Sequence, residues 1–220
     1  MINQLTKEEL LAMQSPDQPA RRNLAWAGML GAALFVGVFT LDGWLRPGYD
    51  PLSAYVSELS LGPRGWVQIA NFLVAGTLFL LFARTVAAEF STGKASRWGP
   101  RLFALYGFFL LLSGPFVMDP AGVVHQLAGA VVFTVMAVTC FVFWRRFRED
   151  PQWQSFAAWT LAAGLITVMA VILLSLVPAP PAPPNALSPW AGLIQRTILV
   201  TFLTWTFSFA YRLNKQSPVT

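Results

Sequence analysis

Acidic, amide and basic side chains recur beside long apolar runs in this sequence, at positions where hydrocarbon would exclude them unless they had partners or a function. Carboxylates, amides and a guanidinium can together pair with a charged headgroup and hydrogen-bond a small polar ligand. The candidate ligand-binding residues are Asp42, Asp50, Ser53, Ser57, Glu58, Asn71, Asp119, His125, Gln195 and Arg196.

Two of these residues lie deep within apolar runs. At about 1.5 Å of rise per helical residue, Asn71 and Arg196 would lie roughly 8–9 Å beyond the starts of their helices. An arginine at that depth is costly unless it is paired. Asp42 and Asp119 are the carboxylates expected to pair with Arg196.

Three roles compete for this polar cluster. It could be a purely structural network, because buried polar groups need partners whatever the protein does. It could bind a lipid headgroup or a small polar ligand, with Arg196 facing an anionic group while Asn71 and Gln195 supply hydrogen bonds. Transport, sensing and accessory roles are all compatible with such a site.

The third role is a membrane-embedded hydrolase or transferase. The candidate catalytic residues are His125, Asp119 and Ser57. Asp119 would orient His125 as a general base, and Ser53 or Ser57 would supply the hydroxyl nucleophile. No nucleophile-elbow motif surrounds either serine, so the sequence favours binding over catalysis.

The sequence contains few side chains that could bind a metal ion or a cofactor. The chain has one histidine, His125, and one cysteine, Cys140. A bis-histidine haem or a tri-histidine zinc site cannot be built from one histidine. The sequence predicts no metal and no cofactor.

The elements that must position these residues are membrane helices. Hydrophobic residues make up 55% of the 220 positions and charged residues only 11%, whereas soluble domains carry about 25% charged residues. Six apolar runs approach the roughly 20 residues that a bilayer requires, and in lipid such runs form helices. We therefore predict an all-α membrane protein, a bundle of six transmembrane helices, at residues 24–45, 65–83, 102–118, 123–144, 156–177 and 190–211.

Shorter elements complete the predicted organisation. Residues 1–20 are expected to form a cytoplasmic amphipathic segment, residues 21–212 the membrane domain and residues 213–220 a cytoplasmic tail. In the first outer loop, Asp50 before Pro51 is typical of a helix start. Leu52, Tyr55, Val56 and Leu59 would then form an apolar face. We predict a short helix there, lying in the outer interface or folded over the bundle as a lid.

Basic residues predict the orientation. With both termini in the cytoplasm, 12 of the 15 lysines and arginines fall on the inner side. Only Arg46, Arg64 and Arg196 remain outside. This asymmetry explains the net charge of +5 without a nucleic-acid partner. It places the chain in the cytoplasmic (inner) membrane, with membrane lipids as its surroundings and protein partners unspecified.

Three motifs carry a resemblance to a known family. They are GYDP…SELS at residues 48–60, followed by Asn71; MDP at residues 118–120, followed by His125; and GLIQR at residues 192–196. In this order they resemble DUF998, a family of bacterial and archaeal membrane proteins of unknown function, over about residues 22–212.

The resemblance implies a six-helix membrane protein and brings no activity with it. Members of that family often carry a second histidine at the position that is Ala121 here. The absence of that histidine weakens a metal or acid–base role for His125. The three motifs coincide with the polar cluster, which supports the location of a site.

Overall fold

The structure, a computed structural model, describes residues 24–179 and 182–216, except for the side chains of residues 119–121 and 216. Within these residues it is all-helical and contains no strand, which confirms the predicted class. The α-helices are α3 (Ala25–Leu45), α4 (Gly65–Glu89), α5 (Trp98–Leu112), α6 (Met118–Phe147), α7 (Gln154–Ser175) and α8 (Ala191–Gln216). Two 3₁₀ helices are η1 (Val56–Ser60) and η2 (Ser188–Trp190). The amphipathic helix predicted within residues 1–20 lies outside the described residues.

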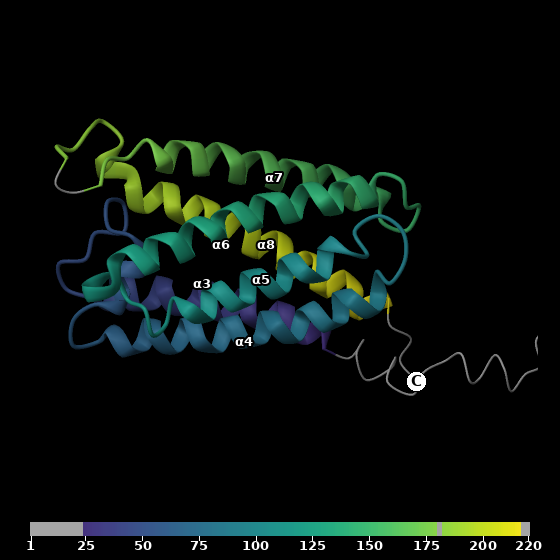
Figure 1. Cartoon of the computed structure of the whole chain (residues 1–220), viewed down its shortest axis with the longest axis horizontal. Helices are drawn as coiled ribbons and strands as arrows, with labels where there is room; N and C mark the ends of the chain where they lie inside the picture. Colours follow the sequence, from purple (N-terminus) through teal and green to yellow (C-terminus); the bar gives the residue numbers. More distant parts are fainter. Residues whose placement is uncertain (1–23, 180–181, 217–220) are drawn as a thin grey trace, which may run out of the picture.

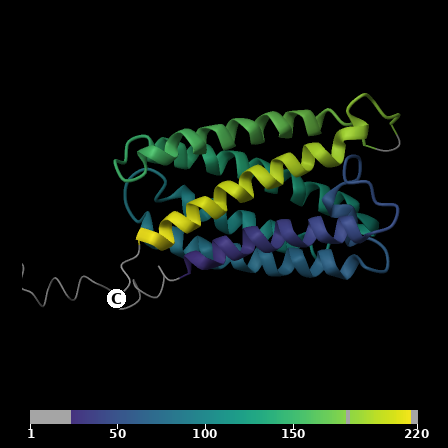
Figure 2. The same ribbon diagram turned by 180° about the vertical axis from the view of Figure 1, so that it is seen from behind.

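The six α-helices form a closed ring in chain order. Each helix packs against the next one along the chain, and α8 returns to pack against α3. Figures 1 and 2 show the resulting elongated bundle, with successive helices antiparallel. Residues 46–64, including η1, lie at one end of the bundle, the η1 end. The loops at residues 90–97 and 148–153 lie at the opposite end, with the end of α8.

Five of the helices are long and apolar enough to cross a membrane, and α5 is shorter. The 15 residues of α5 rise about 22 Å, against about 30 Å of hydrocarbon. The predicted end of this helix at residue 118 is wrong, because Pro115 lacks an N–H and disfavours a helical residue before it. The next helix begins at Met118, not at residue 123, since Pro120 is tolerated in a first helical turn.

Aromatic side chains fill the centre of the ring toward the opposite end. Phe103 stacks on Trp205 with ring centroids 6.2 Å apart, and Phe147 stacks on Trp153 at 4.7 Å. Phe90 and Phe209 pack among them, and all six rings are almost completely buried. Such contacts are worth about 0.5–1.5 kcal/mol per pair beyond area burial. This half of the bundle is therefore a solid core.

Glycine allows a close helix approach between α4 and α5. A Cβ added at Gly76 would lie 2.7 Å from the Gly107 carbonyl oxygen, and one added at Gly107 would lie 2.8 Å from the Gly76 oxygen. By contrast, a Cβ at Gly37 on α3 would meet nothing within 4 Å. The α4–α5 contact thus depends on two facing glycines, a common device in membrane bundles.

The first loop differs from its prediction. No helix begins at Asp50; residues 51–53 form a turn, and a five-residue 3₁₀ helix, η1, follows at Val56–Ser60. Val56 and Leu59 are buried as predicted, whereas Leu52 is exposed. The η1 helix packs against α3, α4, α6 and α8. The lid (residues 49–60) therefore covers the end of the ring, although most of it is not helical.

Candidate functional site

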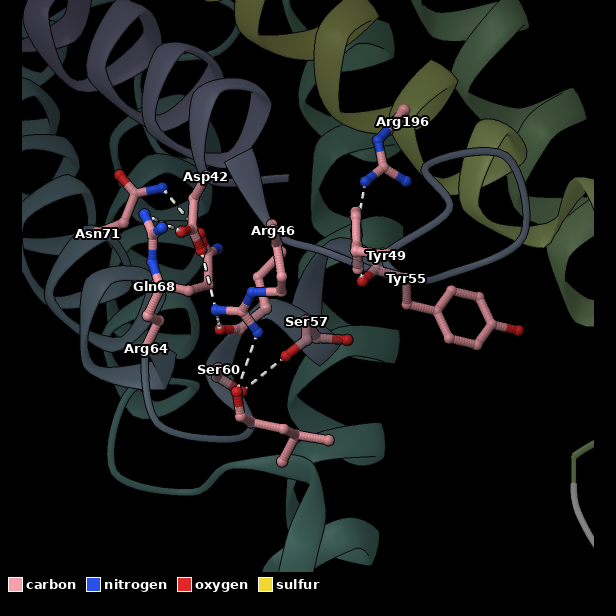
Figure 3. A network of polar contacts seen from close by, with 12 residues as sticks. Asp42, Arg46, Tyr49, Tyr55, Ser57, Ser60, Arg64, Gln68, Asn71 and Arg196 are labelled. Carbon is pink, nitrogen blue, oxygen red and sulfur yellow. Dashed lines mark hydrogen bonds and ion pairs between the residues drawn. The ribbon is translucent and has the colours of Figure 1, made fainter. Parts of the chain in front are cut away.

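A buried carboxylate ties the end of α3 to the loop beyond the lid. Asp42 is only 3% exposed, and its Oδ2 accepts a hydrogen bond from Arg46 Nη2 at 3.0 Å. Arg64 Nη2 lies 3.0 Å from Oδ1 as an ion pair. The Arg46 guanidinium also donates to the carbonyl oxygens of Leu59 (2.8 Å) and Leu61 (2.9 Å). Figure 3 shows both arginines converging on Asp42. The expected pairing of Asp42 with the deep arginine of α8 is therefore wrong.

Arg196 binds the lid itself. Its Nη1 donates to the carbonyl oxygens of Pro51 (2.7 Å), Ala54 (2.8 Å) and Gly192 (3.1 Å), and its Nη2 donates to the Tyr49 hydroxyl. In Figure 3, Arg196 reaches from α8 toward Tyr49 in the lid. These contacts satisfy a costly cation with backbone oxygens and a phenol instead of a carboxylate.

The rest of the GLIQR motif holds the same segment. A Cβ at Gly192 would lie 2.3 Å from a lid carbonyl oxygen, so only glycine permits this approach. The backbone N–H of Leu193 donates to Leu52 O at 2.9 Å. Gln195 Oε1 accepts from the Val56 N–H at 2.6 Å. Residues 192–196 of α8 are therefore the anchor of the lid, and we use that name below.

Other predicted site residues shape the lid locally. Asp50 accepts from the Leu52 N–H at 3.1 Å and from the Ser53 hydroxyl at 2.6 Å. The Ser53 hydrogen bond holds the pKa of Asp50 below its ordinary value. Glu58 accepts from the Tyr55 N–H at 3.0 Å. These two carboxylates are bonded within the lid and do not face a common ligand.

The phenol of Tyr49 is a half-buried part of the lid. Burial raises its pKa, and the hydrogen bond from Arg196 acts in the opposite direction. Its hydroxyl donates to Tyr55 O at 2.9 Å. Tyr49 thus links Arg196 to the carbonyl oxygen of Tyr55, the residue before η1.

Asn71 lies between α3 and α4. Its Nδ2 donates to Phe35 O at 3.1 Å and to Gln68 Oε1 at 3.2 Å. Asn71 and Gln68 are both buried on α4. They tie α4 to the backbone of α3 beneath the lid.

A cavity of about 510 Å³ lies under the lid. Its lining comes from all six α-helices and from the lid, so it occupies the centre of the ring at the η1 end. Most lining residues are apolar, and none of those described is charged. The polar lining residues are Tyr55, Ser57, Ser113, His125, Gln126, Thr134, Ser175 and Gln195.

His125 is buried in the cavity wall, and the centroid of its ring lies 6.3 Å from that of Phe72 in an edge-to-face arrangement. Its Nδ1 lies 2.7 Å from Phe116 O. A carbonyl oxygen can only accept, so Nδ1 carries the proton and Nε2 of the neutral ring is an acceptor. The bond to Phe116 also fixes the turn between α5 and α6.

The structure forms no serine–histidine pair among its described residues. The Ser57 hydroxyl lines the same cavity but contacts Met118 Sδ at 3.4 Å, while Ser53 bonds to Asp50. The side chain of Asp119 lies outside the described part of the chain, although its backbone opens α6. No described contact therefore supports the nucleophile and base roles.

The cavity has a lateral mouth. All of its exposed lining residues come from two helices and the segment that follows the second: Gln126, Ala130, Thr134, Ser175 and Ala179. Figures 1 and 2 show α6 and α7 diverging toward the η1 end. The mouth therefore faces sideways from the bundle, between α6 and α7.

Three contributors were missed by the sequence analysis. Arg46 follows Asp42 by four residues, a spacing that predicts a contact on one helix face. Gln68 precedes Asn71 by three, which is the same kind of signal. Tyr49 lies in the GYDP motif, where its hydroxyl could have been proposed as a partner of Arg196. In the described residues, no three His, Cys, Asp or Glu side chains are grouped closely enough to hold a metal ion.

Comparison of the chain with protein-family models identifies its family. Residues 29–212 match DUF998, described as a protein of unknown function. The chain belongs to DUF998. The match covers most of the sequence and all six helices, which agrees with the resemblance drawn from the three motifs. Neither the curated proteins nor the solved structures contain a match.

Family membership and the structure together show the general class of this protein. This DUF998 protein has several helices that are long and apolar enough to span a membrane, so it is a multi-pass membrane protein. In it, the three motifs noted in the sequence form the lid, the turn that opens α6 and the anchor, and all three lie at the η1 end.

Proposed function

We propose that this protein crosses the inner membrane six times and binds a lipid-like ligand in the cavity beneath the lid. In this proposal both termini are cytoplasmic, and the lid lies at the outer face. The observation that carries the proposal is the apolar cavity with a lateral mouth, because a ligand dissolved in lipid could enter it directly.

Charge asymmetry supports the orientation. Of the 12 lysines and arginines in the described residues, only Arg46, Arg64 and Arg196 belong to the η1 end, and the positive-inside rule makes that end the outer one. The short helix α5 would cross together with the turn at residues 113–117, which His125 closes by its bond to Phe116. This accounts for six crossings.

Cysteine labelling tests the orientation. The native Cys140 is buried, so it provides a silent background. A cysteine replacing Ala182, which is exposed at the η1 end, should react with a membrane-impermeant maleimide in intact cells. A cysteine replacing Ser96 should react only after the cells are opened. The reverse pattern would overturn the proposed topology.

Size and lining support ligand binding. Ligand pockets usually measure about 300–1,000 Å³ and combine an apolar lining with a few placed polar groups. The cavity, at about 510 Å³, has this character. Arg196, first considered for an anionic group, is already bound to lid carbonyls and Tyr49. Ligand binding is therefore assigned to the cavity, with Ser57, His125 and Gln195 as its polar contacts. The anchor, together with Asp42 and its two arginines, holds the lid over the cavity.

A matched pair of glycine variants tests the binding site. A Cβ at Gly129, in the cavity wall, meets nothing within 4 Å, and the same is true of Gly37 outside the cavity. Gly129→Leu should fill the cavity without disturbing a helix contact, and Gly37→Leu should leave it open. Native mass spectrometry should show a co-purifying lipid on the wild type and on Gly37→Leu but not on Gly129→Leu. Equal lipid occupancy in all three proteins would overturn the assignment to this cavity.

A further inference from the structure

The hydrogen-bonding groups left in the cavity are fixed by their protein partners. His125 donates through Nδ1 to Phe116 O at 2.7 Å, which leaves Nε2 of the neutral imidazole as an acceptor. No described residue bonds to that Nε2. The cavity thus offers one buried ring nitrogen able to accept a hydrogen bond from a ligand.

Gln195 supplies the complementary group. Its amide oxygen is identified by the Val56 N–H, which can only donate and lies 2.6 Å away. The amide NH₂ of Gln195 is therefore left as a donor, and no described residue accepts from it. This side chain is also buried, at 8% exposure, in the wall of the same cavity.

Charged ligands find no counter-charge there. The described lining contains no charged side chain, and the nearby arginines are bound elsewhere: Arg46 and Arg64 to Asp42, and Arg196 to the lid. An unpaired charge in an apolar cavity is strongly disfavoured. A hydroxyl, in contrast, donates one hydrogen bond and accepts others, which matches one free acceptor and one free donor.

We propose that the ligand of this cavity is an uncharged lipid alcohol, such as a long-chain alcohol or a monoacylglycerol. Its hydroxyl donates to His125 Nε2 and accepts from the Gln195 amide, and its chain extends among the apolar lining residues toward the mouth. This assignment rests on the proposed function and specifies the chemistry of the bound headgroup.

Four probes with the same 18-carbon chain test the headgroup, since they differ only at the polar end: oleyl alcohol, 1-monooleoylglycerol, methyl oleate and oleyl phosphate. Native mass spectrometry of the detergent-purified full-length protein, titrated with each probe, gives the apparent Kd. One hydrogen bond contributes roughly 1 kcal/mol, so a hydroxyl probe should bind the wild type about fivefold to tenfold more tightly than methyl oleate. A preference for the glycerol probe over the simple alcohol would identify the headgroup as a polyol, and the opposite order would identify it as a single hydroxyl.

Two variants locate the contact. His125→Phe removes the acceptor, and Gln195→Met removes the donor while keeping the side-chain length and a weak thioether acceptor near the Val56 N–H. Each should weaken binding of the hydroxyl probes about tenfold, and His125→Phe should leave methyl oleate, which has no hydroxyl to donate, unchanged within about twofold. Melting temperatures without a probe report whether each variant folds. The comparison of probes on the wild type does not depend on either variant.

The outcomes separate the two proposals. Tighter binding of oleyl phosphate, or equal binding of methyl oleate and the alcohols, would overturn the hydroxyl assignment while the cavity remained a lipid site. Loss of all probes in Gly129→Leu would support the cavity in either case. Binding of no probe, or binding that Gly129→Leu leaves unchanged, would overturn both proposals.

Discussion

Replacing Arg196 by leucine removes the cation that holds the lid to α8, and we expect the lid to open. The guanidinium donates three hydrogen bonds to carbonyl oxygens, two of them in the lid, and one to the Tyr49 hydroxyl. Leucine can replace none of these. The Gln195 contact and the backbone bond from Leu193 would remain, so the lid should loosen without detaching completely.

The free-energy cost of losing Arg196 can be worked out from the hydrogen bonds that its guanidinium makes. Hydrogen bonds to charged groups contribute about 1.5–3 kcal/mol each, but the contributions are not additive, and water can replace some of them once the lid opens. We take on the order of 3 kcal/mol for the loss of the three lid contacts. Because about 1.4 kcal/mol is a factor of ten, lid opening should become roughly a hundredfold more frequent.

Hydrogen–deuterium exchange of the lid peptide measures this opening directly, because local opening exposes its amides. Arg64→Leu is the control: Arg64 is half-exposed and makes one ion pair, with Asp42, which keeps Arg46 as a partner. Because Arg64 is half-exposed and Asp42 keeps Arg46, losing this one ion pair should cost about 1 kcal/mol or less, so exchange should rise less than about fivefold. Equal exchange in the two variants, or an Arg196→Leu lid as protected as the wild type, would refute the view that the anchor holds the lid.

Three further perturbations test separate features of the bundle. Gly76→Ala should destabilise the protein by about 1–3 kcal/mol, because the new Cβ lies 2.7 Å from a carbonyl oxygen of α5. Gly37→Ala should be neutral or slightly stabilising, because its Cβ meets nothing within 4 Å. Thermal unfolding of the two variants measures the difference. Gly192→Ala should expose the lid to protease without lowering the melting temperature of the helices, since the three atoms nearest to the new Cβ are two lid carbonyl oxygens and Arg196 Nη1. A lid that stays resistant to protease would contradict this. Burial raises the pKa of Tyr49 above 10.0, so the folded state keeps the phenol proton longer than the unfolded state and stability falls as pH rises above that value. Tyr49→Phe should therefore lose less stability than the wild type between about pH 9 and 11, and an identical slope would exclude this contribution.

Helix positions were largely predictable from hydropathy, and the exceptions have local causes. The first helix was predicted at residues 24–45 and is found at Ala25–Leu45. The third was misplaced because Phe116, Val117 and Met118 extend the apolar run beyond the point at which Pro115 ends the helix. The apolar content of a segment predicts whether it can lie in lipid. A proline predicts where the hydrogen-bonded helix ends.

The polar cluster was predictable as a location but not as a set of contacts. The depth of Arg196 correctly predicted that it needs partners, but carboxylates were expected and carbonyl oxygens were found. Backbone oxygens have no signature in a sequence, because every residue carries one. The path that brings residues 51 and 54 against α8 is a property of the loop, and the apolar spacing of Leu52, Val56 and Leu59 predicted a helix there instead.

The cavity could not have been predicted at all. It exists because α6 and α7 diverge at the η1 end, whereas large aromatic rings fill the same ring of helices at the opposite end. Spacing along one helix does not reveal the distance between two helices. His125 was nevertheless identified from its residue type and its position at a helix start, and the structure places it in the cavity wall.

The closure of the ring by α8 has a consequence for biogenesis. The lid is made early, but its anchor is on the last helix: Val56 and Gln195 are 139 positions apart. At a synthesis rate of about 5–20 residues per second, roughly 7–28 s pass before the lid amides can meet their acceptor. During that interval the first helices sit in the membrane with an uncovered end, available to insertion chaperones and proteases. Premature termination before residue 192 would leave such a chain permanently uncapped, and it would be recognisable to quality control by its loose first loop.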